Sequence, residues 1–385
     1  MVTSQQLTPG VYREEIFPKP APGLFTGVPV FLGFAETGPI NSPQSLTLWS
    51  QFTETFGQPL ADGYLAYAVR GFFENGGSLC LVVRLEDGVS LTEALGGPGD
   101  DTGGLGAIAS LNEIDLVCVP DLMRGNPDQD DVLRMQNVIL EHCDLLGDRF
   151  AILDSLPPVA VQVTQSLERV KEQRSKLRGK NGALYYPWIK AENGPDWMPP
   201  CGHIAGVYAR SDQQFGVHKA PANETIEGIV DLKFNLTNRE QDILNPLGVN
   251  CLRAFPGRGI RVWGARTLSD EANWIYVNVK RLFLTVGRWL ELNLADLAFE
   301  PNELKLWVRI ERELTAYFED LLQQGALKGP TEQTAFYIKC DAETNPPEVR
   351  EAGMVVTEIG LAPAIPSELI TVRIILGASG VKVAA

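Results

Sequence analysis

The sequence predicts an α/β protein whose core is a mixed sheet flanked by helices, with an extended arm at the N-terminus. Short runs that are mostly apolar and lack a regular polar–apolar alternation, such as residues 114–119 and 150–156, indicate strands buried on both faces. Amphipathic segments of helical period, such as residues 130–146, lie between them. This alternation is typical of a largely parallel sheet covered by helices on both sides.

In the first half of the chain, apolar runs alternate with helical patterns. The expected strands are residues 30–34, 79–85, 114–119, 150–156 and 184–189, and the expected helices are residues 50–56, 65–73, 130–146 and 158–178. Asn75-Gly76-Gly77 is a strong stop signal for the second helix. Residues 96–106 are rich in Gly and Asp and are expected to form a loop.

Residues 199–267 form a dense stretch of Gly, Pro, Asn, Arg and aromatic residues, where an ordinary helix or strand would show one simple period. The small residues Gly202, Ala205, Gly206 and Ala209 allow another element to approach closely. The stretch therefore specifies a defined shape, which serves either an active site or a structural keystone.

The last third of the chain predicts two long helices followed by three strands. The helices are residues 274–294 and 303–322, and the strands are residues 334–340, 354–359 and 369–376. Asn302 stands between the helices and is expected to cap the second one. The strands show looser alternation and have no obvious partners.

The first 28 residues are expected to form an arm rather than part of the core. Pro9, Pro18, Pro20 and Pro22 each fix φ and remove a backbone donor, so no helix forms here. The run Val11 to Ile16 alternates as one exposed strand would. Such an arm has little core of its own and is expected to dock on something else, for example a neighbouring subunit.

Composition narrows the class of protein. A net charge of −15 argues against a nucleic-acid surface, and the basic residues between 171 and 180 are expected to be the solvated end of a helix. Six widely spaced cysteines without a CxxC pair suit a reducing compartment. No apolar run approaches the roughly 18 residues of a membrane span, and no N-terminal signal pattern is present, so we expect a soluble cytoplasmic protein.

The residues do not form a recognisable catalytic pattern. His142 is expected on a helix surface, and His203 and His218, fifteen residues apart, match no metal-binding spacing. The Gly-rich segments at 103–106 and 257–259 lack the flanking residues of a phosphate loop, and no GxSxG elbow occurs. We therefore expect no catalytic residues, no cofactor and no metal.

Two long segments carry a resemblance to a known family. They are PPCGHIAGVYARSDQQFGVHKAPANE, residues 199–224, and LNPLGVNCLRAFPGRGIRVWGARTLS, residues 244–269. Together they closely resemble the signature of the tail sheath proteins of contractile phage tails, R-type bacteriocins and extracellular contractile injection systems. Further similar segments occur in the same order along nearly the whole chain, at residues 9–16, 30–43, 52–57, 72–77, 186–188, 299–307, 325–329, 335–346 and 362–368.

The resemblance implies a structural role. It implies a subunit that stacks in six-membered rings around an inner tube and contracts to drive the tube through a target envelope, without a nucleotide. The partners would be sheath neighbours, the tube protein, and baseplate and terminal cap proteins, with no nucleic acid and no small-molecule substrate. The particle would be assembled in the bacterial cytoplasm. Larger members insert domains where this chain has only the short segment from Leu85 to Ile114, so the resemblance implies a minimal sheath.

The resemblance also implies a division of the chain. Residues 1–28 would be the N-terminal linking arm, 29–195 a variable outer α/β portion, 196–376 a conserved inner domain, and 377–385 the tail of the C-terminal arm. The arms would add strands to the sheets of neighbouring subunits, which edge pairing permits.

Three groups of residues are assigned roles on this basis. The inter-subunit arm residues are Val11, Tyr12, Glu14, Glu15, Ile16, Val372 and Ile374. Lys280, Arg281 and Arg288 would face the tube, or would form a solvated helix face. His218, Arg258, Arg261 and Arg266 would be the structural keystone, with the arginines in buried or interfacial ion pairs.

Two alternatives stay open. The first is an α/β enzyme with a pocket around His203, His218 and Arg266. The second is another baseplate or tube component of the same machine, which the length and the C-terminal pattern disfavour. The sequence does not distinguish a phage from a bacteriocin or an injection system.

Overall fold

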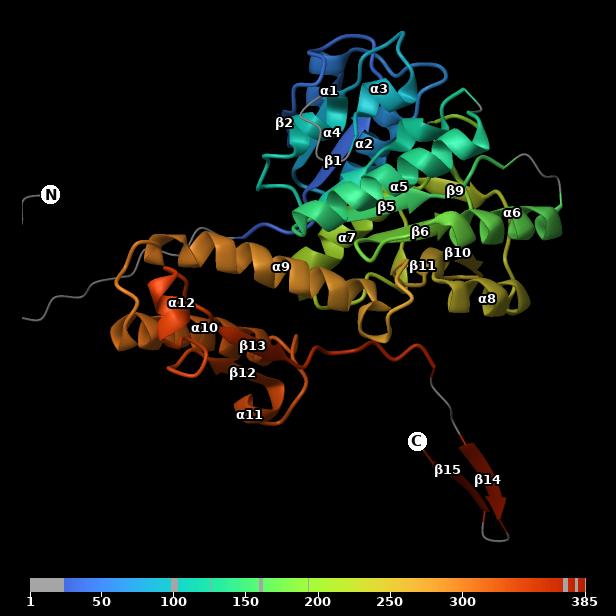
Figure 1. Ribbon diagram of the computed structural model, residues 1–385. Helices are drawn as coiled ribbons and strands as arrows, with labels where there is room; N and C mark the ends of the chain where they lie inside the picture. Colours follow the sequence, from blue (N-terminus) through green and yellow to red (C-terminus); the bar gives the residue numbers. More distant parts are fainter. Residues whose placement is uncertain are drawn as a thin grey trace, which may run out of the picture.

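The structure is a computed structural model that describes residues 24–97, 103–125, 127–158, 162–192, 194–369, 373–377 and 380–384. It contains an α/β body, a smaller C-terminal part built on helices α9 and α10, and a two-stranded hairpin near the C-terminus (Figure 1). Among these residues, no helix combines the length and the apolarity required to cross a membrane.

The body is organised on one nine-stranded mixed sheet, in the order β2-β3-β1-β4-β5-β6-β10-β11-β8. The strands are β1 (Pro29–Gly33), β2 (Gln44–Leu46), β3 (Cys80–Arg84), β4 (Leu116–Cys118), β5 (Phe150–Asp154), β6 (Gly182–Tyr186), β8 (Glu224–Thr225), β10 (Val249–Phe255) and β11 (Gly259–Trp263). The six strands from β3 to β10 are parallel, while β2, β11 and β8 pair antiparallel at the two edges. The expected mixed sheet is confirmed.

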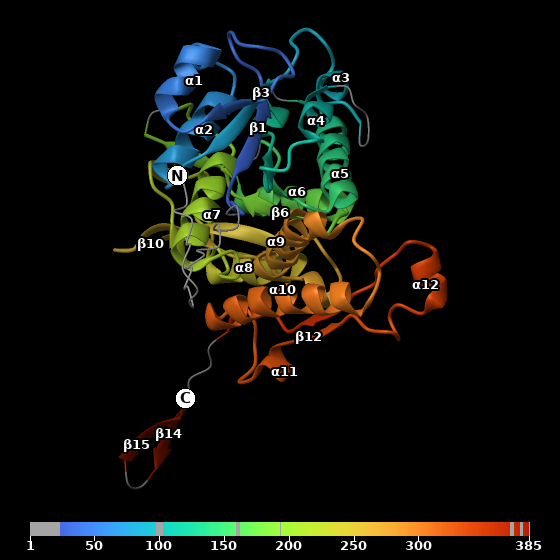
Figure 2. The same ribbon diagram turned by 90° about the vertical axis from the view of Figure 1, so that its left-hand side faces the viewer.

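Helices cover both faces of the sheet, as the apolar strands require. Along β1, Val30 and Leu32 point into one core and Phe31 into the other, and all three are fully buried. The first core lies under α3 (Leu91–Leu95), α4 (Gly103–Ile108), α5 (Gln129–Leu146) and α6 (Val163–Lys176), and the second under α1 (Trp49–Phe56), α2 (Leu65–Glu74) and α7 (Cys201–Phe215) (Figure 2). Helix α8 (Asn238–Leu244) and the small sheet of β7 (Ile189–Ala191) and β9 (Ile229–Leu232) complete the body.

The C-terminal part has its own core. Helices α9 (Val277–Leu294) and α10 (Leu304–Gln323) pack through an apolar cluster that also includes Phe336. Strands β12 (Phe336–Lys339) and β13 (Glu358–Leu361) form an antiparallel pair beside them, with α11 (Glu332–Ala335) and α12 (Pro347–Glu351) in the connections. Strands β14 (Arg373–Gly377) and β15 (Gly380–Ala384) pair with each other and lie away from both parts (Figures 1 and 2).

Helices α2 and α7 approach closely because small residues line their contact. A Cβ added at Gly202 would lie 2.2 Å from the Ala68 carbonyl oxygen, and one at Gly206 would lie 2.5 Å from the Phe72 carbonyl oxygen. Neither position has room for a methyl group, so the expectation that these small residues admit another element is confirmed.

Three sequence expectations need correction. The segment expected as a loop at 96–106 contains the start of α4, because Leu105 and Ile108 are buried in the first core. Asn302 does not cap α10. The N-cap is Glu303, and the Asn302 side chain instead bonds the Met354 carbonyl and the Trp307 indole. His142 is buried rather than on a surface, and burial lowers its pKa to about 4.

Strands from both sides of residue 195, β6 and β10, are hydrogen-bonded neighbours in one sheet. The division into a variable outer portion, 29–195, and a conserved inner domain, 196–376, stays a prediction.

A pair of glycine substitutions tests the close packing of α2 and α7. We expect Gly206→Ala to destabilise the chain by about 1–3 kcal/mol, because the added methyl overlaps backbone atoms. Gly287→Ala in α9 is the matched control, since nothing lies within 4 Å of its Cβ position, and we expect it to stabilise the chain by about 0.5–1 kcal/mol. Urea unfolding followed by tryptophan fluorescence measures both. A Gly206→Ala chain as stable as the wild type would contradict this packing.

Candidate assembly surfaces

The root of the N-terminal arm is held by a buried arginine. Arg281 of α9 donates to both Asp212 oxygens, at 2.9 and 2.6 Å, and to Asp115 Oδ2 at 2.9 Å. Asp115 also accepts hydrogen bonds from the backbone N–H groups of Gly27 and Val28, at 3.0 and 2.7 Å. Three distant segments of the chain therefore meet at one guanidinium.

The electrostatics of this cluster depend on burial. Arg281 is 2% exposed, and Asp115 and Asp212 are also buried. Burial raises the pKa of Asp212, and the contact with Arg281 opposes that rise. Burial also acts to lower the pKa of Arg281, but the two carboxylates outweigh it and raise that pKa above its ordinary value. Without Arg281, two carboxylates would stay buried with no counterion.

The expectation that Lys280, Arg281 and Arg288 face a tube is corrected, because all three side chains are buried inside the chain. Arg288 donates to the carbonyl oxygens of Phe25 and Asn112, at 3.2 and 3.0 Å, and so also holds the N-terminal root. The Lys280 ammonium lies 4.6 Å from the centre of the Trp274 ring. Helix α9 lies between the body and α10, so this face of α9 meets protein rather than solvent (Figure 1).

A second set of contacts holds the root of the C-terminal arm. Arg266, which follows β11, forms a two-pronged ion pair with Glu368, with Nε donating to Oε1 at 3.0 Å. Asn278 of α9 donates to the carbonyls of Ala364 and His218. Both ends of the described body are thus fastened to α9 or to the segment between β11 and α9.

The predicted keystone residues take different roles. Arg266 forms the ion pair that was expected, although within the chain and only partly buried. His218 is half-buried and contributes its backbone carbonyl, and burial lowers its pKa. Arg258 is exposed, Arg261 is half-buried, and both bond Asn223 rather than a carboxylate. Ion pairs of these two with a neighbouring subunit stay a prediction.

The sheet of β12 and β13 has two open edges. Each strand has one hydrogen-bonded partner strand within the described part of the chain. The outward N–H and C=O groups of such edges can pair with a strand from another chain. Of the predicted arm residues, Val11, Tyr12, Glu14, Glu15, Ile16 and Val372 lie outside the described residues, and Ile374 lies in β14, paired through the backbone with Val383.

The alternative enzyme pocket is not assembled. His203 lies in the first turn of α7 and His218 lies three residues beyond its end, so about 20 Å of helix separates them. His203 is packed against Gly71, neither ring nitrogen has a polar partner among the described residues, and burial lowers its pKa to about 4. The cavity beside it holds about 20 Å³, which is room for one water molecule rather than a substrate.

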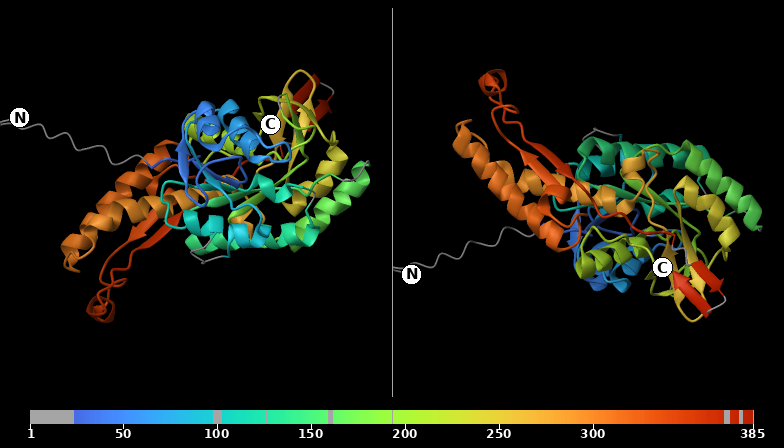
Figure 3. Two further views of the ribbon diagram at one scale, coloured as in Figure 1. Left: turned by 90° about the horizontal axis from the view of Figure 1, so that it is seen from above. Right: turned by 90° about the horizontal axis from the view of Figure 1, so that it is seen from below.

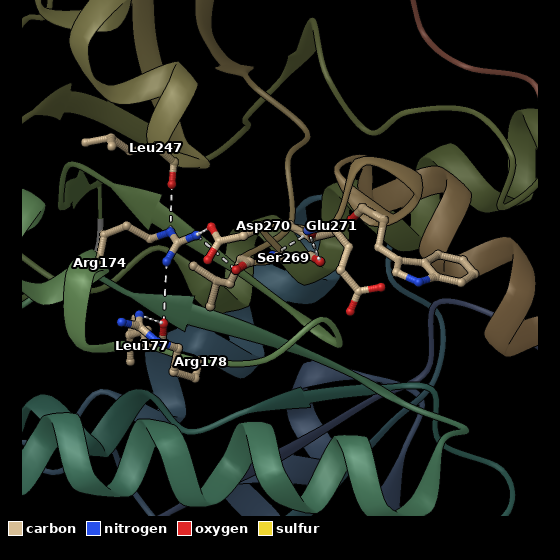
Figure 4. A network of polar contacts seen from close by, with 10 residues as sticks. Arg174, Leu177, Arg178, Leu247, Ser269, Asp270 and Glu271 are labelled. Carbon is tan, nitrogen blue, oxygen red and sulfur yellow. Dashed lines mark hydrogen bonds and ion pairs between the residues drawn. The ribbon is translucent and has the colours of Figure 1, made fainter.

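Arg174 is one of the structural arginines that sequence reasoning missed. Arg174 lies in the basic run that was expected to be solvated, yet it is buried (Figure 4). It donates to the carbonyls of Leu247 and Leu268, at 2.6 and 2.9 Å, and pairs with Asp270. It therefore ties α6 to the segments on either side of the β10–β11 hairpin.

A sequence signal for these buried charges exists. Asp115 stands between Ile114 and Leu116 in a mostly apolar run, and Arg281 shares a helix face with Val277 and Leu284, four residues before it and three after it. Charged residues inside an apolar pattern are rarely buried without a partner. The pattern can therefore mark Asp115 and Arg281 as partnered, although it does not name the partners.

Open strand edges such as those of β12 and β13 can accept a strand from another chain. Comparisons with known proteins give the class of protein. Residues 103–268 match the family model described as the phage tail sheath protein central domain. A chain of the anti-feeding prophage baseplate is 30% identical, with 97% of this chain and 99% of that chain covered and a TM-score of 0.74.

Two further comparisons extend the likeness. The sheath complex of the extracellular contractile injection system PVC, in its contracted state, is 28% identical, with 98% and 99% of the two chains covered and a TM-score of 0.77. The tail sheath protein of Vibrio phage KVP40 is 26% identical over 51% of this chain, which is 29% of the phage protein. The chain thus matches less than a third of that relative's length.

This protein belongs to the tail sheath family of contractile particles. The family assignment rests on the near complete overlap with the sheath-type chains, and it confirms the resemblance seen in the sequence.

Replacing the buried arginine tests the N-terminal root. We expect Arg281→Met to cost about 3–5 kcal/mol of folding free energy at pH 8, because Asp115 and Asp212 lose their counterion. Burial already raises the pKa of Asp212 above its ordinary value of 3.8, and in the folded variant Arg281 no longer opposes that rise. The folded state therefore takes up protons as the pH falls, and the deficit shrinks towards pH 5. Urea titrations at both pH values measure it.

The control is the triple variant Asp115→Asn, Asp212→Asn, Arg281→Met, which removes all three charges. We expect it to recover part of the lost stability at pH 8, because an amide at position 115 keeps only one of the two acceptor oxygens that Gly27 and Val28 use. A deficit for Arg281→Met that is equal at pH 8 and pH 5 would show that the carboxylates are not its source.

The C-terminal root is tested by a double-mutant cycle on Arg266 and Glu368. The pair is partly exposed, so we expect each single alanine variant to cost no more than about 1 kcal/mol of global stability. Both variants should instead speed proteolytic removal of the residues after Ala364, and the double variant should be no faster than either single one. Additive effects on the cleavage rate would mean that the two side chains act independently.

Proposed function

We propose that the chain is the repeating subunit of a contractile sheath that surrounds an inner tube and drives it through a target envelope when the sheath contracts. The observation that carries this proposal is the match over 98% of the chain to a contracted sheath, combined with chain ends that are fastened at their roots. Its partners are sheath neighbours, the tube protein, and baseplate and cap proteins, and assembly takes place in the bacterial cytoplasm.

Strand exchange links the subunits. The N-terminal run Val11 to Ile16 and the C-terminal segment that includes Ile374 pair with the open edges of β12 and β13 in neighbouring copies. Ala364 and Glu368, which precede the hairpin, are hydrogen-bonded to Asn278 and Arg266. These two contacts set the direction in which the C-terminal arm leaves the body.

Contraction is a rigid-body rotation of folded subunits that stay linked by their arms. The buried contacts of Arg281 and Arg174 favour a body that does not deform. The free energy for the motion then comes from the interfaces between subunits, whose free energy is lower in the contracted state than in the extended state. The mechanism requires neither the binding nor the hydrolysis of a nucleotide.

A second candidate is a sheath-type ring attached to the baseplate. The 30% identical chain of the anti-feeding prophage comes from a baseplate structure, which supports this position. Such a ring would share the fold and the arm contacts, but it would not propagate into a long polymer by itself.

Electron microscopy of the purified full-length chain tests the proposed function. We expect long hollow cylinders in negative stain, and we expect deletion of residues 1–20 to leave a folded chain that does not polymerise. Circular dichroism controls for folding of the deleted variant. Full-length protein that persists as monomers at high concentration would contradict the sheath, and closed single rings would favour the baseplate ring.

A further inference from the structure

A cluster of arginines lies at the tip of the β10–β11 hairpin. Residues 253–261 contain Arg253, Arg258 and Arg261 and no carboxylate. Arg253 donates to the Asn238 and Gln241 side chains, Arg258 to Asn223, and Arg261 to Asn223 and to the Arg258 carbonyl. These three arginines, called the basic tip here, form no ion pair with any residue that the structure describes.

The basic tip is unusual in a chain with a net charge of −15. Three guanidinium groups close together repel one another, and neutral amide partners do not offset that charge. Arg258 Nε and Nη1 and Arg261 Nη2 also donate no hydrogen bond to the described residues. The Arg253 and Arg258 guanidinium groups lie 5.2 and 5.7 Å from the centre of the Phe255 ring. Unused guanidinium N–H groups, positive charge and the Phe255 ring together favour a partner that carries carboxylates.

The turn between α9 and α10, together with the helix ends on either side of it, carries negative charge. Residues 291–305 contain Glu291, Asp296, Glu300 and Glu303 and a single basic residue, Lys305. All four carboxylates are exposed and none is in an ion pair with another described residue. We call this turn the acidic tip.

The acidic tip also presents apolar side chains to solvent. Phe299 adopts a φ of 70°, a strained value for a bulky residue, and its side chain is fully exposed. Leu292 and Leu304 beside it are 46% and 68% exposed. A strained, fully exposed aromatic residue among exposed leucines indicates a contact surface that a single copy of the chain leaves uncovered.

The two tips lie at opposite ends of the molecule. Figure 3 shows the orange turn between α9 and α10 at one end and the gold strands of the β10–β11 hairpin at the other, from above and from below. They are therefore too far apart to neutralise each other within one copy.

We propose that the acidic tip of one copy docks on the basic tip of the next copy. Complementary patches at opposite ends of one molecule make a heterologous contact, which repeats from copy to copy and builds either a closed ring or an open polymer. In this contact Glu291 and Glu300 accept hydrogen bonds from the free nitrogens of Arg258 and Arg261, and Phe299 packs on the guanidinium groups. The inference rests on the proposed function, since it requires that copies of the chain assemble.

Charge reversal tests the contact, with full-length protein throughout. The first variant is Arg258→Glu with Arg261→Glu, and the second is Glu291→Lys with Glu300→Lys. Glu291 and Glu300 are chosen because neither of them caps a helix. Each variant alone places like charges opposite one another in every contact. We expect the critical concentration for cylinder formation to rise about tenfold in each, as measured by sedimentation and negative stain.

An equal mixture of the two variants provides the sharpest measurement. Every contact between unlike variants is then attractive. At one contact the glutamates introduced into the basic tip of the first variant meet the lysines introduced into the acidic tip of the second, and at the reverse contact the unchanged arginines meet the unchanged glutamates. We expect the mixture to assemble at close to the wild-type concentration. The matched control, Glu54→Lys with Glu86→Lys, changes two exposed carboxylates outside both tips and should assemble like the wild type.

The outcomes separate the two proposals. Wild-type protein that forms no cylinders contradicts the proposed function. Wild-type cylinders together with charge-reversed variants that assemble equally well, or a mixture no better than its components, overturn the tip contact alone. Circular dichroism and thermal melting of each variant establish that a loss of assembly is not a loss of folding.

Discussion

The fold depends most on the guanidinium of Arg281, which lies between Asp115 and Asp212 in the interior. Burying three charges has a high desolvation cost, and good geometry with further hydrogen bonds is required to offset it. Here the cost is offset by a two-pronged contact with Asp212 and by the backbone N–H groups of Gly27 and Val28 on Asp115. These bonds fix α9 against the sheet and against α7, and so set where the C-terminal part lies.

Helix α9 is also where both chain ends are fastened. Arg281 and Arg288 hold the segment that enters from the N-terminal arm, and Asn278 holds the segment that leaves towards the C-terminal arm. A pull on either arm therefore reaches the same helix, whose inner face is buried. Under the proposed sheath function, force between neighbours would pass through this one helix, and the body would move as a unit.

The sequence was informative about the layers and less so about the contacts that join them. The apolar runs at β1, β4 and β5 predicted the parallel strands, because burial on both faces leaves a local pattern. Arg281 was interpreted as facing outward, because its partner Asp115 is 166 residues away and no local pattern records that contact. The family resemblance was recognisable because many short segments occur in one order, whereas the tube-facing assignment rested on one helix and is wrong.

The most direct measurement is electron cryomicroscopy of cylinders of this chain in the extended and the contracted state. If the body is rigid, residues 24–361 superpose in the two states, Arg281 contacts both Asp115 and Asp212 in each, and the differences are confined to the segments beyond the two roots. A shift of α9 against the sheet, with Arg281 released from either carboxylate in one state, would contradict the rigid subunit.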